Sequence, residues 1–429
     1  MGRIALLVAV LAACGTSGGE EPAFDSSGGM LEIGDCGYAV TTKPGAETPQ
    51  PSGSTIGSDP TPVRVHLGFI GDPKTSIIAQ WRTTDEDTTA SVMRYGVGAN
   101  LAEADLTTTV KGIEFRYKGT GMMLYRMHQA HACGLTPGTA YSYEVGDGKH
   151  WSAIATFQTA PDATANPDAE VTFGFLGDSR LGEDVFGQLA TLLQTHAPDV
   201  ILFSGDAVLD GLDQTEWDTW LDAAPALLAS TPIVMADGNH EDNAINFYAQ
   251  FAMPGDQENY GLDYGFAHIT VANDTPEDAS MLTTTTLAAI QSDFTASAAA
   301  RWKVLMNHQP LWSTGATHGS NLTLQASWGP AIDQAAIDLV LNGHEHSYQI
   351  SYPLLGGVVQ PSNATGTTYV VAGGAGAQLY GFSGTAPWSA YNETTYSASV
   401  IDVRRDQMTL TPYRQDGTAI PTGYMKTKQ

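Results

Sequence analysis

Between about residues 63 and 160 the chain consists of short apolar runs separated by Gly, Pro and Asp turns. The runs are VRVHLGFI, TSIIAQWRT, SVMRYGV, YSYEVG and SAIATFQT. Runs of this length, in close succession and rich in β-branched and aromatic residues, are typical of antiparallel strands. Their spacing over about 100 residues predicts a β-sandwich.

From about residue 170 the pattern changes to apolar strands that alternate with helical segments. Strand-like runs are EVTFGFLGD, DVILFSGD, TPIVMADGNHED, RWKVLMNHQP, IDLVLNGHEH and TTYVVAGGAG. Helical stretches are GEDVFGQLATLLQTHA, TEWDTWLDAAPALLA and GPAIDQAA. Strands that alternate with helices predict βαβ units, and therefore an α/β domain with parallel pairing.

Five of these strands end in a compact polar set. The sets contain Asp178, then Asp206, then Asn239 with His240 and Glu241, then His308, and last His344 with His346. Open α/β sheets bind ligands just beyond the carboxyl ends of their strands, so we expect these side chains to meet. Carboxylate, imidazole and amide groups together suit divalent metals of intermediate hardness. Two such ions about 3.5–4 Å apart could hold a phosphoryl group.

The order GD, GD, GNHE, H and GH-x-H resembles the calcineurin-like metallophosphoesterases. The stretch GLTPGTAYSYEVG, followed by ATFQTAP, resembles the end of a fibronectin type III domain. This order of domains is similar to that of the purple acid phosphatases, and the resemblance covers about residues 62–415. It implies an all-β fibronectin type III-like sandwich followed by an α/β metallophosphoesterase domain, a four-layer α/β/β/α sandwich.

The resemblance also implies roles for individual residues. Asp206 matches the carboxylate that bridges two metal ions. The remaining metal ligands would be Asp178 and His346 for the first ion, and Asn239, His308 and His344 for the second. His240 matches a histidine that contacts the phosphate and protonates the leaving group. His318, in STGATHGSN, resembles a second histidine facing the substrate, and a surface-loop histidine is the alternative.

Two positions depart from the family pattern. The first motif is DSR instead of D-x-H, so Arg180 stands where a metal ligand is expected. Purple acid phosphatases draw a tyrosine ligand three residues after the bridging aspartate, and that position is Leu209 here. Asp210 could compensate or could be a turn residue. The planar guanidinium of Arg180 suits a phosphate oxygen, with a simple surface charge as the alternative.

The function implied is that of a metal-dependent phosphoesterase acting on a small phosphoester. We expect hydrolysis of a phosphomonoester by a metal-bound hydroxide at a dinuclear centre of Fe, Zn or Mn. Phosphodiesterases and nucleotidases share these motifs and stay open as alternatives. The departures at Arg180 and Leu209 leave open a degenerate, non-catalytic surface protein that only binds a ligand. An adhesion protein acting through its β-sandwich is a further alternative.

The formal net charge is −27, with only 19 Lys and Arg residues. Proteins that bind nucleic acid build their affinity from basic patches, so this composition disfavours a nucleic-acid partner. Such an acidic balance indicates a well-solvated surface. Nothing in the pattern predicts an oligomeric state.

The N-terminus, MGRIALLVAVLAACG, has a basic residue followed by an apolar run too short to span a bilayer. Its Leu-Ala-Ala-Cys ending resembles the bacterial lipobox, in which Cys14 would receive the lipid. Residues 1–14 are thus predicted to be a lipoprotein signal. We expect an exported bacterial lipoprotein of the cell envelope or surface, held to the membrane by this anchor alone. A cleaved signal and secretion are the alternative.

Residues 15–61 are rich in Gly, Ser, Thr, Pro and Glu, which predicts a flexible linker. The other expected boundaries are 62–161 for the β-sandwich, 168–415 for the α/β domain and 416–429 for a tail. Two cysteines remain after Cys14. In an oxidising compartment Cys36 and Cys133 could form one disulfide, and two free buried thiols are the alternative.

Overall fold

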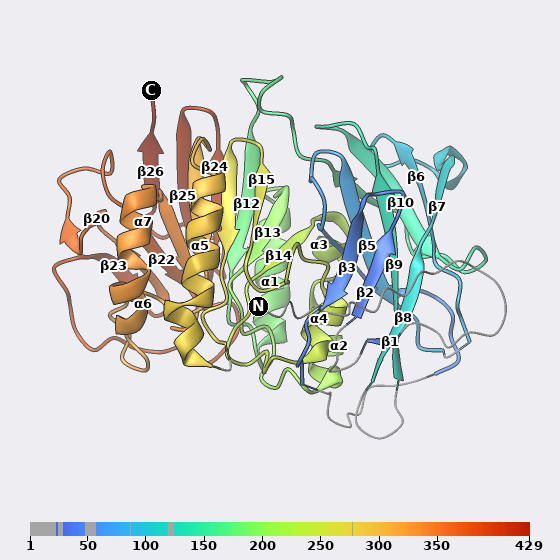
Figure 1. Cartoon of the computed structure of the whole chain (residues 1–429), viewed down its shortest axis with the longest axis horizontal. Helices are drawn as coiled ribbons and strands as arrows, with labels where there is room; N and C mark the ends of the chain where they lie inside the picture. Colours follow the sequence, from blue (N-terminus) through green and yellow to red (C-terminus); the bar gives the residue numbers. More distant parts are fainter. Residues whose placement is uncertain (1–22, 25–28, 48–56, 86, 119–123, 277) are drawn as a thin grey trace, which may run out of the picture.

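The computed structural model describes residues 23–24, 29–47, 57–85, 87–118, 124–276 and 278–429. The predicted signal segment 1–14, with Cys14, lies outside these residues. A β-sandwich occupies one end of the molecule and an α/β domain the other (Figure 1). In the part of the chain that is described, no helix has the length and apolar character needed to cross a membrane.

The β-sandwich is built from two antiparallel sheets, apart from one short parallel pair at an edge. The first sheet contains, in spatial order, β1 (Ala23–Phe24), β8 (Ile113–Lys118), β9 (Leu124–Cys133), β5 (Ser76–Arg82) and β4 (Val63–Gly68). The second contains β11 (Ala155–Gln158), β10 (Ala140–Gly146), β6 (Val92–Val97) and β7 (Thr108–Lys111). A short 3-10 helix, η1 (Glu103–Asp105), precedes β7.

Two larger sheets form the centre of the α/β domain. The six-stranded sheet has the order β14 (Ile233–Met235), β13 (Val200–Phe203), β12 (Val171–Leu176), β24 (Ser397–Val403), β25 (Gln407–Arg414) and β26 (Tyr424–Thr427). The seven-stranded sheet has the order β15 (Tyr260–Tyr264), β16 (Ala267–Val271), β17 (Trp302–Met306), β18 (Leu339–Asn342), β22 (Thr368–Ala372), β19 (Tyr348–Ser351) and β23 (Ser389–Glu393). A small hairpin joins β20 (Leu354–Leu355) to β21 (Val358–Val359).

Helices cover the outer face of each central sheet. The described helices are α1 (Glu183–Gln194), α2 (Gln214–Ala223), α3 (Pro225–Ser230), α4 (Ile245–Gln250), α5 (Thr285–Ala296), α6 (Leu322–Ser327) and α7 (Gly329–Ala335), with the 3-10 turn η2 (Ala279–Thr283) before α5. Pro225 divides the stretch that the sequence predicts as one helix into α2 and α3. Proline cannot donate the backbone hydrogen bond needed inside a helix, and here it occupies a first-turn position.

Side-chain alternation along the strands explains the layers. In β17, Val304 and Met306 join the large core shared with the six-stranded sheet, whereas Leu305 packs into a second core under α5 to α7. Across the first core, the rings of Phe173 and Tyr264 lie 5.9 Å apart. Strands buried on both faces read as continuous apolar runs, as these do. The result is the predicted α/β/β/α sandwich, and the fold class is confirmed.

The N-terminal segment differs from the predicted flexible linker. Its described residues form a hairpin of β2 (Gly29–Ile33) and β3 (Tyr38–Thr42). The described part of the segment then extends to Glu47. The disulfide between Cys36 and Cys133 ties this hairpin to β9, with Cα atoms 5.5 Å apart. Leu31, Ile33 and Val40 are buried. A few well-placed apolar residues and one crosslink therefore order a segment whose composition is otherwise polar.

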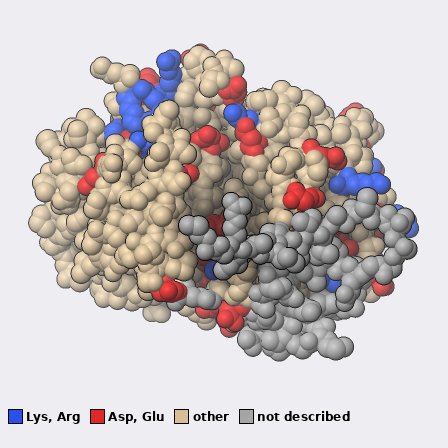
Figure 2. All heavy atoms as spheres, viewed as in Figure 1, with Lys and Arg blue, Asp and Glu red and all other residues tan. Residues whose placement is uncertain are grey.

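The C-terminal segment also differs from the predicted tail. Its residues Tyr424–Thr427 form β26, which pairs with β25 at the edge of the six-stranded sheet. Viewed as in Figure 1, the Lys and Arg side chains gather most densely near β26, while acidic side chains are scattered over the face (Figure 2). Contacts in this region include Arg301, whose guanidinium donates to the carbonyls of Lys428 and Gln429.

The two domains pack through α2 and α3. Arg64 of β4 forms an ion pair of 2.8 Å with Asp222 and one of 3.2 Å with the mostly buried Asp218. The hydroxyl of Tyr143, in β10, donates to the carbonyl of Ala229 at 2.7 Å. Through these contacts the β-sandwich packs against α2 and α3, two of the helices of the α/β domain.

Candidate metal centre

Parallel strands bring the predicted ligands to one edge of the two central sheets. β12, β13 and β14 run parallel to each other, as do β16, β17, β18 and β22. Their carboxyl ends therefore point the same way, and each is followed by a loop. These loops carry Asp178, Asp206, Asn239 and His240, His308, and the pair His344 and His346.

Two groups of side chains lie close enough together to hold a metal ion. One contains Asp178, Asp206 and His346, and the other contains Asp206, His308 and His344. Within each group the possible ligand atoms all lie within 4.8 Å of one another. Asp206 belongs to both, which is the position that a bridging carboxylate requires.

Hydrogen bonds fix which imidazole nitrogen is free to bind a metal. Nδ1 of His308 lies 2.8 Å from the carbonyl of Ser204, and Nδ1 of His346 lies 2.6 Å from the carbonyl of Gln378. A carbonyl only accepts, so each Nδ1 carries a proton and donates. Nε2 of both rings is then directed into the centre. Backbone carbonyls orient metal-binding histidines in this way in many proteins.

The first group leaves a buried nitrogen without a hydrogen bond. Nε2 of His346 has no hydrogen-bond partner among the described residues and lies 3.5 Å from Oδ1 of Asp178. The carboxylate of Asp178 is held in turn by the backbone N–H of His344, at 2.9 Å from each oxygen. A buried carboxylate facing an unpaired imidazole nitrogen fits a metal ion.

The second group is gathered around Nε2 of His308. Nε2 of His308 lies 3.3 Å from Oδ1 of Asp206, 3.2 Å from Oδ1 of Asn239 and 3.1 Å from Nδ1 of His344. Four atoms that can each donate an electron pair thus surround one point. A cation placed among them satisfies every one of these atoms, which agrees with the ligand set expected for the second ion.

Burial and neighbouring charges determine how these groups ionise. Burial opposes the charge on His308, but the carboxylates of Asp206 and Asp178 outweigh it and raise the pKa of His308 well above its usual value. Burial likewise opposes the charge on Asp206, but His308, His240 and Arg180 hold its pKa well below the usual range. Burial and the nearby His308 lower the pKa of His344 to about 2. The centre therefore combines an ionised Asp206 with a neutral His344.

Three of the predicted ligands have a strained backbone. Asp178, Asp206 and His344 have φ values of 61°, 56° and 66°, in the left-handed region that residues other than glycine rarely adopt. Such conformations persist where the surrounding structure imposes them, and they are frequent at functional sites. Each strand here ends in a sharp turn that directs its side chain into the centre.

Glycines at the motif positions allow the loops to approach each other. A Cβ atom at Gly343 would press against the carboxylate of Asp178, and one at Gly238 would press against Asp206 and Glu241. The glycine of GHEH is thus needed for close approach, because its φ does not lie in the left-handed region. Substitution at either position would displace a ligand.

Two buried glutamates support the site. The carboxylate of Glu241 accepts the backbone N–H groups of Gly238, Asp206 and Ala207 at 2.7, 2.9 and 2.8 Å. Burial, and then the nearby Asp206, raise the pKa of Glu241. Glu345 accepts the N–H groups of His318 and Gly319 at 2.6 and 2.5 Å. Both glutamates orient neighbouring groups through these hydrogen bonds.

His240 and Arg180 approach the bridging carboxylate from the side opposite His308. Nε2 of His240 lies 4.0 Å from Oδ2 of Asp206, and its Nδ1 donates to the carbonyl of Leu209 at 2.6 Å. Nε of Arg180 lies 3.6 Å from the same oxygen. The Arg180 side chain is 13% exposed, and its Nε has no hydrogen-bond partner among the described residues. Both groups are therefore available to an anion bound at this centre.

Tyr380 is a member of the site that the sequence analysis did not name. It follows β22 in AGGAGAQLYG, which the sequence shows only as a glycine-rich stretch beside the site. Its ring stacks on His346, with centroids 3.9 Å apart, and its hydroxyl accepts from Arg180 at 3.5 Å. An aromatic residue at the end of a strand in line with the motifs is the signal that could have identified it.

His318 also lies at the centre. Its ring is 4.0 Å from that of His344 and 5.8 Å from that of Tyr380. Burial lowers the pKa of His318. The backbone of the loop that carries it is held by Glu345, while the His318 residue itself is exposed.

The departure at Leu209 leaves no tyrosine at that position, and Asp210 does not replace it. The Leu209 side chain is 38% exposed. The carboxylate of Asp210 accepts the backbone N–H of Leu212 at 2.9 Å, which is the pattern of a turn aspartate. Neither residue joins the two ligand groups of the described structure.

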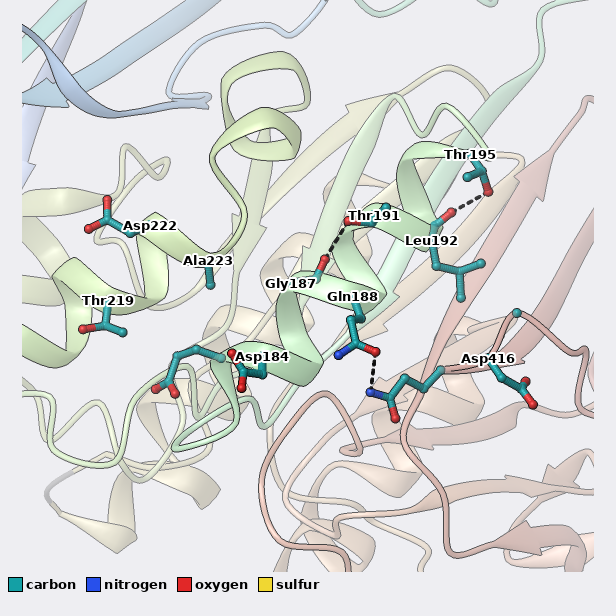
Figure 3. Close-up of a pocket in the computed structure, with 13 residues that line it drawn as sticks. Asp184, Gly187, Gln188, Thr191, Leu192, Thr195, Thr219, Asp222, Ala223 and Asp416 are labelled. Carbon is teal, nitrogen blue, oxygen red and sulfur yellow. Dashed lines mark hydrogen bonds between the residues drawn. The ribbon is translucent and has the colours of Figure 1, made fainter.

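One surface groove lies away from the predicted site. A groove of about 780 Å³ between α1, α2 and the turn 415–417 is lined by Glu183, Asp184, Asp222 and Asp416 among others (Figure 3). None of the predicted site residues lines it. Four carboxylates would repel a phosphate group, so the groove does not compete with the metal centre as a site for phosphoesters.

Comparisons with known proteins agree with this geometry. Residues 62–159 match the family model described as the purple acid phosphatase N-terminal domain, and residues 171–348 match the calcineurin-like phosphoesterase model. The human acid phosphatase type 7 is 27% identical over 389 residues, covering 82% of this chain and 87% of that protein. The soybean (Glycine max) purple acid phosphatase is 23% identical, covering 84% and 83%.

A solved structure has the same fold. It is a purple acid phosphatase isolated from yellow lupin (Lupinus luteus) seeds, with a TM-score of 0.74 and 16% identity over 86% of this chain and 74% of that one. The fold implies a dinuclear metal centre, and the two ligand groups that share Asp206 fit one. The α/β domain therefore matches the calcineurin-like phosphoesterases and the β-sandwich matches the purple acid phosphatase N-terminal domain, so the chain is a purple acid phosphatase-like, metal-dependent phosphoesterase.

Proposed function

We propose that the chain hydrolyses phosphomonoesters at a dinuclear metal centre shared by the two ligand groups. The observation that carries this proposal is the position of Asp206, which belongs to both groups. The proposed ligands are Asp178 and His346 for one ion and Asn239, His308 and His344 for the other, with Fe, Zn or Mn as candidate metals. Bound at these positions, two metal ions would polarise the phosphoryl group and supply an activated water at neutral pH.

Arg180 is the proposed phosphate-binding residue. Its guanidinium is mostly buried, is close to Oδ2 of Asp206 and has an unpaired Nε–H. A planar guanidinium can donate two parallel hydrogen bonds to phosphate oxygens. In the reaction it would stabilise the charge that develops on the equatorial oxygens, because its donors are already in place.

His240 is the proposed general acid, and His318 the second histidine facing the substrate. Because Nδ1 of His240 donates to the carbonyl of Leu209, Nε2 is free to carry the transferable proton. A positioned acid of this kind typically contributes about 10²–10⁴-fold in rate. The proton would pass from Nε2 to the oxygen of the leaving alcohol as the P–O bond breaks.

Arg180, a permanent cation, and His240 both face Oδ2 of Asp206, at 3.6 and 4.0 Å. A phosphomonoester carries up to two negative charges near neutral pH and a diester carries one, so this arrangement favours the monoester. Phosphodiester and nucleotide substrates are the alternative for the same ligand set.

The test is phosphate release from the metal-loaded protein. We expect kcat/KM for p-nitrophenyl phosphate to exceed that for bis(p-nitrophenyl) phosphate by about tenfold or more, a barrier difference of about 1.4 kcal/mol. The reverse preference would identify a phosphodiesterase. Failure to turn over either ester with added Mn²⁺, Zn²⁺ or Fe would identify a non-catalytic protein.

We also propose that the protein is an exported lipoprotein anchored through Cys14. The lipobox-like sequence at residues 11–14 supports this, and so does the Cys36–Cys133 disulfide, because disulfides persist in oxidising compartments. Mass spectrometry of the mature N-terminal peptide tests it. A diacylglyceryl Cys14 is expected, and an unmodified N-terminus at a later residue would indicate secretion.

A further inference from the structure

The loop that carries Asn239 and His240 has an unfavourable backbone conformation. Two consecutive residues, Asp242 and Asn243, have φ values of 55° and 51° in the left-handed region. Residues other than glycine adopt this region at a cost, and they remain in it where neighbouring structure holds them. The α/β domain supplies part of this support, for example through the backbone N–H of Gly211, which donates to Asp242, and the hydroxyl of Tyr248, which donates to Asn243. The N-terminal segment supplies a further part.

Residues 43–47 of the N-terminal segment run along this loop and hydrogen-bond to it. The backbone N–H of Glu47 donates to the carbonyl of Asn243 at 2.8 Å, and the N–H of Ile245 donates back to the carbonyl of Glu47 at 2.9 Å. The amide of Asn243 donates to the carbonyl of Gly45 at 3.2 Å. These bonds form a short parallel bridge between Glu47 and Ala244. The strained residue Asn243 is therefore held through its backbone and its side chain.

Lys43 adds a charge to this contact. Its ammonium group donates to Oδ1 of Asn243 at 2.6 Å and forms an ion pair of 2.9 Å with Glu258. The side chains of Lys43 and Glu258 are only 19% and 11% exposed, so the pair is weakly screened by solvent. Lys43 thus connects the loop, through Asn243, to the segment 256–259, through Glu258.

The same network continues to the start of the loop. The buried Asp237 accepts from Tyr248 at 3.2 Å and from Asn273 at 3.1 Å, and Asn273 also donates to Glu258. Two acidic side chains, Asp237 and Glu258, are therefore connected through shared donors. Lys43 is the cation in contact with this group. Its removal would leave the mostly buried Glu258 without its ion-pair partner, in a network that reaches Asp237, two residues before Asn239.

A covalent anchor fixes the N-terminal segment in place. The Cys36–Cys133 disulfide ties the β2–β3 hairpin to the β-sandwich. Tyr38 and His131 form a hydrogen bond of 2.9 Å beside it, and Thr41 donates to the carbonyl of Gly255 at 3.1 Å. The segment 43–47 leaves this anchored hairpin directly and so has little freedom to move away from the loop.

We propose that residues 43–47 act as a strap that positions Asn239 and His240 for metal binding and proton transfer, with Lys43 as its central positioning residue. This inference rests on the proposed function, since it concerns the loop of the same site. A segment outside the α/β domain thereby contributes to the geometry of the reaction. Residues that orient metal ligands from behind typically change metal affinity or activity by about 10–100-fold when they are replaced.

The first test compares Lys43→Ala with Lys43→Arg and with the control Lys74→Ala. Lys74 lies on the sandwich domain and pairs with the exposed Asp72. We expect Lys43→Ala to lower kcat about tenfold with a smaller change in KM. We also expect it to raise, by about tenfold, the Zn²⁺ concentration at which the more weakly bound ion half-saturates its site. The Arg variant, which keeps the charge, should recover most of both losses. Unchanged kcat and Zn²⁺ affinity in Lys43→Ala would overturn the proposal.

The second test removes one strap hydrogen bond without changing a buried side chain. Glu47→Pro lacks the N–H that reaches Asn243, whereas Glu47→Ala keeps it, and the Glu47 side chain is exposed. Hydrogen–deuterium exchange of a peptide spanning residues 237–250 is the readout. We expect Glu47→Pro to increase exchange in this peptide and Glu47→Ala to leave it unchanged. Equal exchange in both variants would show that the strap does not hold the loop.

These readouts separate the strap from the proposed function. Hydrogen exchange and Zn²⁺ titration report on the loop even if no phosphoester is turned over. A wild-type protein that lacks turnover, but whose loop loosens in Lys43→Ala and Glu47→Pro, would refute the hydrolase assignment and support the strap. If the wild-type protein were active and its variants matched it in all readouts, the result would support the hydrolase assignment and refute the strap.

Discussion

The guanidinium of Arg180 lies 3.6 Å from Oδ2 of Asp206, while His308 lies 3.3 Å from the other oxygen, Oδ1. The bridging carboxylate therefore has an imidazole on one side and a permanent cation on the other. Arg180 occupies the position at which relatives with a D-x-H motif have a metal ligand. Since a protonated guanidinium cannot bind a metal, the role that we propose for Arg180 is to donate to the phosphate group of the substrate.

Replacing Arg180 should weaken phosphate binding and catalysis together. We expect Arg180→Ala to lower kcat/KM for p-nitrophenyl phosphate by about 10²-fold, because one pre-positioned donor to the transition state is lost. Arg180→Lys should recover only part of this, since a lysine keeps the charge but not the planar fork. Steady-state kinetics and inhibition by inorganic phosphate provide the measurement. An Ala variant with wild-type affinity for phosphate would assign Arg180 to a structural role.

Loss of His240 should depend on the leaving group. His240→Ala is expected to lower turnover of an alkyl phosphate by about 10²-fold or more, because the departing alkoxide needs a proton. p-Nitrophenolate is a stable anion and leaves without protonation, so its ester should lose much less. The ratio of the two rates in wild type and variant is the measurement. An equal loss for both esters would contradict the general-acid role.

Glu241 is expected to matter for folding as well as for the site. Glu241→Gln keeps the shape of the side chain but presents one acceptor oxygen to three backbone N–H donors. At least one donor is left facing an amide N–H₂, which should lower the free energy of unfolding by about 1–3 kcal/mol. Denaturant titration measures this, with the exposed Asp184→Asn as a control expected to change stability by less than about 0.5 kcal/mol. If the two variants lost the same stability, the buried carboxylate would not be the support described.

A buried histidine, His268, gives the fold a pH dependence that is separate from the site. His268 lies 2.7 Å from Asp263 and 2.9 Å from Asp293. Burial opposes its charge, but the two carboxylates outweigh burial and raise the pKa of His268 to about 9. Because the folded-state pKa is raised, the stabilisation is complete below the unfolded value of about 6.5 and is lost as the pH rises through about 9.

The expected size of this effect is about 1 kcal/mol, reduced by solvent at the exposed Asp263. Urea unfolding at pH 6 and pH 10 should show the difference in wild type, and His268→Gln should reduce it. An unaltered pH dependence in the variant would assign the effect to other groups.

Much of the site could be predicted because short motifs and strand ends coincide. Asp178, Asp206 and His308 each follow an apolar run, and parallel strands bring their carboxyl ends together whatever the loops do. His344 and His346 lie in separate ligand groups although they are two residues apart, because Gly343 lets the turn pack against Asp178. The local sequence pattern was therefore enough to predict that these residues belong to the site.

The features that the sequence did not reveal depend on contacts between distant segments. Tyr380 reaches Arg180 across 200 residues, and neither position carries a motif that points to the other. Lys43 reaches Asn243, again 200 residues away, from a segment whose composition predicts a linker. The hairpin that carries it is ordered by one disulfide and by apolar side chains that are few and interrupted by glycine. The composition of the whole segment is dominated by its polar residues and by glycine, so it does not indicate the ordered hairpin within it.

The most direct test of the central claim is the number of metal ions bound per chain. The measurement uses plasma mass spectrometry on the chain without residues 1–14, after incubation with Fe, Zn and Mn and removal of free metal. Asp206→Asn is the matched variant, because it keeps the size of the side chain and removes the charge that both ligand groups share. We predict two ions per chain in the wild type and a fall toward zero in the variant. One ion or none in the wild type, or an unchanged number in Asp206→Asn, would contradict a dinuclear centre bridged by Asp206.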